Sequence, residues 1–167
     1  MLDDRVGPIG ELVAGDLPDD PPADFRPIRP REGFHMMMGQ FFGRVEDGML
    51  VVAFRCSRRH LNNHGTCHGG MLASFADFAA YSVRLAAGLH VTSIPTVSLA
   101  VEYLRPVRLG DWVEARVQLT KRGRNLLFSR MTATVAGQIV FTATGIFTLG
   151  AEDAKGLDAL APVLDGA

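Results

Sequence analysis

The residues best suited to chemistry lie in one short run and in the segment that follows it. The run reads Asn62-Asn63-His64-Gly65-Thr66-Cys67-His68-Gly69-Gly70, and a long apolar segment with one carboxylate, Asp77, comes directly after it. The spacing of apolar residues in this segment predicts a helix that begins at Gly69. The first backbone N–H groups of such a helix are free to bind an oxygen that gains negative charge. Asp77 is an acid or base candidate in apolar surroundings. Together these features predict an enzyme that acts on a carbonyl group.

Strands are predicted on both sides of this run. Before it, residues 37–46 and 49–56 flank Asp47-Gly48, a dipeptide typical of a tight hairpin turn. Residues 57–68 are predicted to form a loop, and a helix is expected from residue 69 to about 87, where Gly88 is well placed to end it. Beyond Gly88 the apolar residues alternate with polar ones and predict four strands, at residues 97–103, 113–119, 126–135 and 139–149.

This order of elements predicts an α+β domain. Three of the four later connections are short, so the sheet of about six strands should be mainly antiparallel. A helix that is apolar on nearly every face needs cover on nearly every side, and a strongly curved sheet supplies that cover. We therefore expect a long central helix wrapped by a curved, mainly antiparallel sheet.

Composition divides the chain into three parts. Residues 1–33 hold six of the nine prolines and are predicted to be an irregular N-terminal arm with one short helix near residues 9–14. Residues 34–149 form the folded domain, and residues 150–167 are a tail with weak helical character at 152–160. Lys and Arg number 17 against 18 for Asp and Glu, which gives no support for nucleic acid as a partner.

Three local features indicate the compartment of the protein and whether it enters a membrane. The beginning, Met1-Leu2-Asp3-Asp4, lacks the basic and apolar regions of a signal peptide. The only cysteines, Cys56 and Cys67, are expected to be reduced thiols of a cytoplasmic protein. Residues 71–87 are apolar but contain Asp77 and Arg84, and each would cost about 2.5–3.5 kcal/mol near a bilayer centre. A helix buried inside a soluble domain, with no membrane partner, is the better interpretation.

Over residues 35–149 the chain resembles the hotdog-fold acyl-CoA thioesterases of the PaaI-like, 4HBT-type superfamily. The resemblance rests on an ordered set of short motifs, because none of them is specific alone. In order, they are Asn62-x-x-Gly65-x-x-His68-Gly69-Gly70, Asp77, Pro95-Thr96-Val97, Leu104-Arg105-Pro106, Gly110-Asp111 and Gly123-Arg124. The resemblance implies a hotdog fold and hydrolysis of an acyl- or aryl-CoA thioester to free acid and coenzyme A.

The resemblance also implies a role for each matching residue. Asp77 would be the catalytic carboxylate, acting as general base on water or as nucleophile, while the Gly69 N–H would polarise the thioester carbonyl. Asn62 would help to place water or substrate, and His68 would support this arrangement. The residues expected to bind substrate are Gly70, Thr96, Arg122 and Arg124. The two arginines would meet the phosphates of coenzyme A, and no metal or cofactor is expected beyond this substrate.

The separation of Gly69 and Asp77 predicts a site shared by two chains. Eight residues on one helix span about 12 Å, whereas reacting groups must approach within about 3–3.5 Å. The Asp side chain leans toward the helix N-terminus but cannot span this gap. In a symmetric dimer with antiparallel helices, Gly69 of one chain would lie near Asp77 of the other. We therefore expect at least a homodimer, and the resemblance adds a homotetramer as a further assembly.

Several of these residues have a purely structural alternative. Asp77 could pair with Arg84 or bond Tyr81, although the motif around it favours catalysis. Arg122 and Arg124 fit an ordinary solvated turn as well as they fit a phosphate contact.

The histidines of the run invite a metal interpretation. His60, His64 and His68 are spaced by four residues, and Cys67 is adjacent. That spacing aligns ligands only on a continuous helix, and Gly65 with its neighbouring asparagines indicates a loop, so a metal site is not expected. Cys67 also lacks an evident paired base, which argues against a cysteine nucleophile.

Two other functions stay open on the sequence. One is a hydratase or dehydratase of acyl thioesters on the same fold, although a helical Asp77 fits hydrolysis better. The other is a non-catalytic module that binds or senses acyl-CoA. The acyl group itself depends on the shape of a cavity, which the sequence does not determine.

Overall fold

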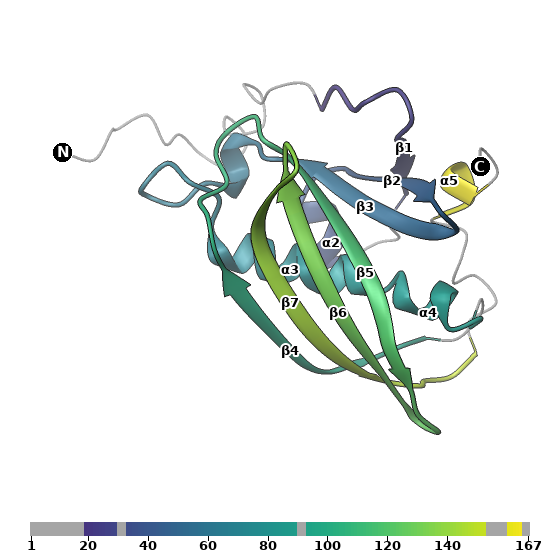
Figure 1. Cartoon of the computed structure of the whole chain (residues 1–167). Coiled ribbons are helices and arrows are strands. Elements are labelled where there is room, and N and C mark those ends of the chain that lie inside the picture. The colour runs from purple at the N-terminus through teal and green to yellow at the C-terminus, as the bar shows by residue number, and fades with distance from the viewer. Residues whose placement is uncertain (1–18, 30–32, 90–92, 153–159, 165–167) are drawn as a thin grey trace.

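In the described part of the chain, a single antiparallel sheet of seven strands forms the body of the molecule (Figure 1). The computed structural model describes residues 19–29, 33–89, 93–152 and 160–164. In chain order the strands are β1 Arg26–Ile28, β2 Phe41–Glu46, β3 Met49–Arg55, β4 Thr96–Tyr103, β5 Trp112–Arg122, β6 Leu126–Val135 and β7 Gln138–Thr148. Across the sheet their order is β1-β2-β3-β5-β6-β7-β4, and every neighbouring pair is antiparallel.

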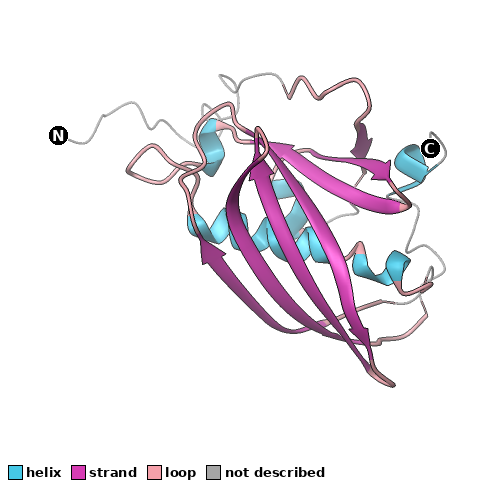
Figure 2. Cartoon of the chain, viewed as in Figure 1, coloured by secondary structure: helices cyan, strands magenta, loops and turns pink. Residues whose placement is uncertain are grey.

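The longest helix, α3 (Gly69–Ala80), lies across one face of this curved sheet (Figure 2). It contacts β4, β5, β6 and β7. Its buried residues are Leu72, Phe75, Ala76, Ala79 and Ala80, and they join one large core with the inward side chains of the strands. The predicted α+β architecture, a long helix wrapped by a curved antiparallel sheet, is confirmed.

The predicted first strand begins too early. Residues 34–37 form a short helix, α2 (Phe34–Met37), and β2 begins only at Phe41. Gly39, with a φ of +85°, reverses the chain between the two elements. Periodicity could not separate these elements, because a four-residue apolar helix and the start of an apolar strand read alike.

The predicted helix over residues 69–87 is interrupted. α3 is followed by a second short helix, α4 (Val83–Ala86), and the link contains three-residue backbone hydrogen bonds such as Tyr81 N–H to Phe78 O and Ser82 N–H to Ala79 O. The completely buried Arg84 lies beyond this tight turn, where its guanidinium stacks 3.7 Å from the Tyr81 ring centre. Gly88, with a φ of +69°, ends α4 as predicted.

Part of the N-terminal arm belongs to the sheet, which accounts for the seventh strand. β1 pairs with β2, and Phe25 packs edge-on against Trp112 with ring centres 5.2 Å apart. Phe25, Phe42 and Trp112 belong to a second, smaller apolar cluster beside the main core. The short helix expected near residues 9–14 lies outside the described residues, as does most of the helix expected at 152–160. A short helix, α5 (Ala161–Leu164), packs on β1 and β2.

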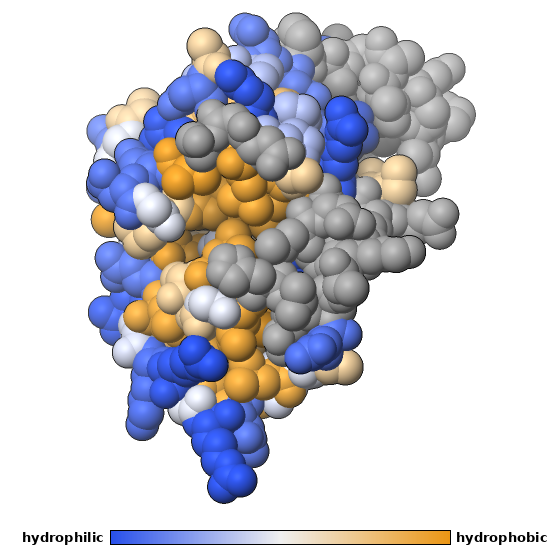
Figure 3. Space-filling model, turned by 90° about the vertical axis from the view of Figure 1, so that its right-hand side faces the viewer, coloured by the Kyte–Doolittle hydropathy of each residue, from blue (hydrophilic) through white to orange (hydrophobic). Residues whose placement is uncertain are grey.

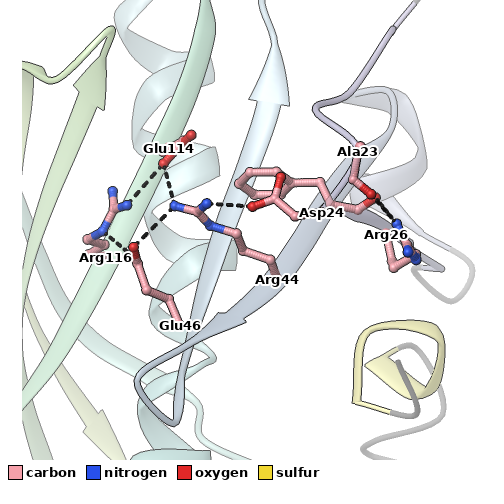
Figure 4. A network of polar contacts seen from close by, with 8 residues as sticks. Ala23, Asp24, Arg26, Arg44, Glu46, Glu114 and Arg116 are labelled. Carbon is pink, nitrogen blue, oxygen red and sulfur yellow. Dashed lines mark hydrogen bonds and ion pairs between the residues drawn. The ribbon is translucent and has the colours of Figure 1, made fainter. Parts of the chain in front are cut away.

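A network of charges ties the arm to the sheet (Figure 4). Arg44 on β2 donates to Asp24 of the arm at 2.6 Å and lies 3.3 Å from both Glu46 and Glu114. Arg116 on β5 completes the network at 2.8 Å from Glu46. The hydrogen bond from Arg44 lowers the pKa of Asp24, and the one from Arg116 lowers the pKa of Glu46. The charged forms of both carboxyls are therefore favoured in the folded state.

The end of the molecule that carries α4 and the β2–β3 turn exposes apolar surface (Figure 3). Val45 and Met49 are more than a third exposed there. A hollow of about 190 Å³ beside them is lined mainly by apolar residues of β2, β3, α4, β5 and α5. Among the described residues, none of the helices is both long and apolar enough to cross a membrane.

Candidate functional site

The loop before α3 is held by a buried histidine. The His60 ring accepts the Ser57 N–H at Nδ1 (3.0 Å), so its Nε2 carries the proton and donates to Met38 O at 2.8 Å. The His60 carbonyl in turn accepts the His68 N–H at 2.7 Å. Both ring nitrogens are therefore occupied by structural bonds. Within the described residues, no group of three His, Cys, Asp or Glu side chains is placed to hold a metal ion.

Asn62 closes the loop that leads to the helix. Its Oδ1 accepts the backbone N–H groups of His64 (2.8 Å) and Thr66 (3.2 Å), and its Nδ2 donates to Thr66 Oγ1 at 3.0 Å. A backbone bond from Asn62 N–H to Thr66 O adds to this ring. In the isolated chain the hydrogen bonds of the Asn62 side chain therefore stabilise the loop. One hydrogen of its amide group stays available for a ligand.

His68 caps the start of α3 and leaves one donor open. Its Nδ1 accepts the Gly70 N–H at 2.9 Å, and its carbonyl accepts the Met71 N–H. Within the described part of the chain, no acceptor takes the N–H of Gly69, the first residue of the helix. The Gly69 carbonyl accepts the Tyr103 hydroxyl at 2.7 Å. The structure therefore presents one unused backbone donor at the position predicted to polarise a carbonyl.

Asp77 is held by Thr96 and not by Arg84. The Thr96 hydroxyl donates to Asp77 Oδ1 at 2.7 Å, and the carboxylate is half-buried on α3. Arg84 donates instead to the Tyr81 hydroxyl at 2.6 Å. The other carboxylate oxygen, Oδ2, accepts no hydrogen bond from the described residues. Asp77 is therefore oriented through one oxygen while the other stays open to water or substrate.

A β-bulge turns Thr96 toward Asp77. The register between β4 and β7 shifts between Thr96 and Ser98. Leu99 and Val101 pack against the core and alternate with outward residues, so an undisturbed strand would point Thr96 away from the helix. The extra residue, Val97, is 60% exposed. The bulge thus re-aims one side chain toward the candidate catalytic carboxylate.

The two halves of the candidate site lie at opposite ends of β4. Thr96, its first residue, bonds Asp77, whereas Tyr103, its last residue, bonds Gly69. Both groups lie on α3, where the eight residues from Gly69 to Asp77 span about 12 Å. Asp77 and the open Gly69 N–H therefore do not meet within one chain.

The two arginines expected at coenzyme A phosphates lie in different surroundings. Arg122, the last residue of β5, donates to the Ala87 carbonyl at 2.8 Å and so binds the C-terminal end of α4. Arg124 is exposed in the turn between β5 and β6, and no described residue pairs with it.

Two cavities flank Gly69, and sequence reasoning found neither of them. One, of about 370 Å³, lies between α2 and the first turns of α3 and reaches His68, Gly70, Met71 and Ser74. The other, of about 330 Å³, lies on the Tyr103 side of Gly69. Sequence reasoning also missed the bond from Tyr103 to Gly69. The one sequence signal for this bond is the alternation along β4, which places Tyr103 on the same inward-facing side as Leu99 and Val101.

The two cysteines are buried free thiols that are hydrogen-bonded to each other. The hydrogen bond from Cys67 lowers the pKa of Cys56 to about 6, and the same bond raises the pKa of Cys67. The Cys67 sulfur lies 3.9 Å from the His68 carbonyl, which is not a base. The geometry gives Cys67 no activating partner for nucleophilic attack.

Known proteins match this chain over the candidate site. The family model described as Thioesterase superfamily matches residues 64–141. A candidate esterase of Pseudomonas aeruginosa is 30% identical over 129 residues, which make up 77% of this chain and 96% of that protein. Acyl-coenzyme A thioesterase PaaI of Escherichia coli is 35% identical over 81 residues, which make up 48% of this chain and 55% of PaaI.

A solved structure agrees with these matches. A mutant of the phenylacetic acid degradation protein PaaI from Thermus thermophilus is 31% identical, with a TM-score of 0.55. The match covers 65% of this chain and 93% of the Thermus chain. The expected hotdog fold is confirmed. The chain belongs to the thioesterase superfamily.

Proposed function

We propose that the protein is an acyl-CoA thioesterase that hydrolyses an acyl- or aryl-CoA thioester to free acid and coenzyme A. The observation that carries the proposal is the Asp77 carboxylate, fixed at one oxygen by Thr96 and open at the other. Thioester hydrolysis needs a base for water and a donor for the developing oxyanion. The unused Gly69 N–H at the start of α3 is such a donor. The name of the E. coli relative agrees with an acyl-coenzyme A substrate.

The exposed edge of the sheet supports a composite site in a homodimer. Among the described strands β4 lies at the end of the sheet, with Val97 and Tyr103 more than half exposed. Antiparallel pairing of β4 with its copy, about an axis between Leu99 and Ala100, would place Thr96 of one chain opposite Tyr103 of the other. Because Thr96 holds Asp77 and Tyr103 holds Gly69, this pairing would bring the carboxylate toward the open N–H.

In this arrangement each group has a definite task. The carbonyl oxygen of the thioester accepts the Gly69 N–H, which stabilises the negative charge that develops on it. Asp77 of the other chain has one of two tasks: it removes a proton from the water that attacks the carbonyl carbon, or it attacks that carbon itself and forms an anhydride that water then hydrolyses. In both routes the carbon–sulfur bond breaks and coenzyme A leaves as the thiol. Asn62 and His68 keep the loop and the first turn of α3 in place. Arg124 is available to bind a phosphate of coenzyme A, whereas the guanidinium of Arg122 already donates a hydrogen bond at the end of α4. A homotetramer stays a further proposal.

Release of free thiol from a panel of acyl- and aryl-CoA thioesters tests the proposal. Replacing Asp77 by Asn keeps the size of the side chain and removes the base or nucleophile, so we expect kcat to fall by about 100- to 10,000-fold. Tight binding of acyl-CoA with no thiol release, unchanged in the Asp77→Asn variant, would show a binding module instead. Addition of water to an enoyl-CoA without thiol release would show a hydratase.

A further inference from the structure

The short helix α2 exposes large apolar side chains beside the candidate site. Phe34, Met36 and Met37 are each at least 60% exposed. Gly33 and Gly39, with φ values of +117° and +85°, bracket the helix. Exposure of three such side chains in one turn is costly in water and marks a surface that binds something apolar.

α2 nevertheless packs at a defined position on the fold. The His35 ring packs edge-on against Phe78 of α3, with ring centres 5.0 Å apart. The residue that follows α2, Met38, is buried, and its carbonyl accepts the His60 Nε2–H. These two anchors place Phe34 and Met37 at the wall of the cavity of about 370 Å³, whereas Met36 does not line it.

The cavity opens beside the predicted oxyanion donor. His68 and Gly70 line it, and they are the residues on either side of Gly69. Its walls contain three thioethers, those of Met37, Met38 and Met71, beside the apolar side chains of Phe34 and Leu61. The polar residues of the lining are Arg59, His60, His68 and Ser74. The His60 ring on its wall already uses both nitrogens within the fold. The thioethers and the other apolar side chains therefore give the cavity an adaptable apolar surface close to the carbonyl position.

We propose that this cavity binds the acyl group and selects flexible acyl chains of medium length. The inference rests on the proposed thioesterase function. A water-sized group occupies about 30 Å³ in the liquid, so about 370 Å³ admits roughly ten methylene-sized groups. Methionine side chains adapt their shape, so they accommodate chains of several lengths better than one rigid ring. Met37 is the specificity-determining residue that this geometry assigns.

Hydrolysis of a homologous series from acetyl-CoA to lauroyl-CoA tests the assignment. Each methylene that enters the cavity should raise kcat/KM about fourfold, the equivalent of about 0.8 kcal/mol, until the cavity is full. Met37→Ser removes apolar contact worth about two methylenes, so the ratio of kcat/KM for decanoyl-CoA to that for acetyl-CoA should fall about 15-fold. Met37→Trp fills part of the cavity and should move the preference toward shorter chains.

Met36→Ser is the matched control, because Met36 has the same side chain in the same helical turn but does not line the cavity. It should keep the wild-type ratio. Equal ratios in the Met36 and Met37 variants, with wild-type hydrolysis intact, would overturn the assignment and leave the thioesterase function standing. A ratio that instead falls in Leu104→Ser would place the acyl group in the cavity on the Tyr103 side. Absence of hydrolysis of every thioester by the wild type would refute the function itself.

Discussion

Mixing two inactive variants provides the sharpest test of the composite site. Asp77→Ala removes the carboxylate half of the site. Asn62→Ala removes the three side-chain hydrogen bonds that shape the loop before Gly69, and so disables the donor half. The two changes lie at opposite ends of β4. Each variant alone should therefore form dimers in which both sites are defective.

Symmetry determines the size of the recovery. In a heterodimer one site combines both substitutions, while the other combines the intact Asp77 of one chain with the intact Asn62 of its partner. Random exchange of equal amounts makes half of the dimers heterodimers, each with one intact site of two. The mixture should therefore reach about one quarter of the wild-type activity per chain. A site built within one chain gives no recovery, because every chain then carries a defect in its own site.

The assay requires proof that subunits exchange. The two variants would carry different affinity tags, and heterodimers would be purified through both tags before thiol release is measured. Purified heterodimers should show about half of the wild-type activity, since one of their two sites is intact. Doubly tagged dimers that form in good yield but release thiol no faster than either parent would refute the shared site.

Three further predictions address the site and the arm. Thr96→Val removes the hydrogen bond to Asp77, a bond to a charged group worth about 1.5 kcal/mol, so kcat should fall about tenfold; an unchanged kcat would deny Thr96 this role. Phe25→Ala should lower the free energy of unfolding by about 3 kcal/mol in urea titrations, because the buried ring packs on Trp112, and should leave KM unchanged. Arg44 lowers the pKa of Asp24, so the pair stabilises the fold above the unfolded pKa near 3.8, and this contribution disappears as pH falls through the folded value. Asp24→Asn should thus flatten the acid side of the profile of unfolding free energy against pH. Near neutral pH the variant should lose less than about 1 kcal/mol of unfolding free energy, because the carboxyl is half exposed.

Local patterns in the sequence determine much of this protein. Asp47-Gly48 joins β2 and β3, Gly88 ends α4, and period-two alternation marks β5, β6 and β7. The helix start at Gly69 is also local, because the side chain of the preceding residue, His68, accepts the Gly70 N–H. Such features need only neighbouring residues, so their physical causes are contained in short stretches of the chain.

Pairing between distant segments decided the rest. Alternation along residues 97–103 points Thr96 away from the helix, and only the bulge formed against β7 turns it to Asp77. In the same way Arg122 reads as a free cation in the sequence, yet the fold brings the Ala87 carbonyl to it across 35 residues. A one-residue insertion in a strand pair depends on the partner strand, and no periodicity within a single strand contains that information. The sequence by itself therefore determined which residues are available for chemistry, and the tertiary structure decided which of them meet.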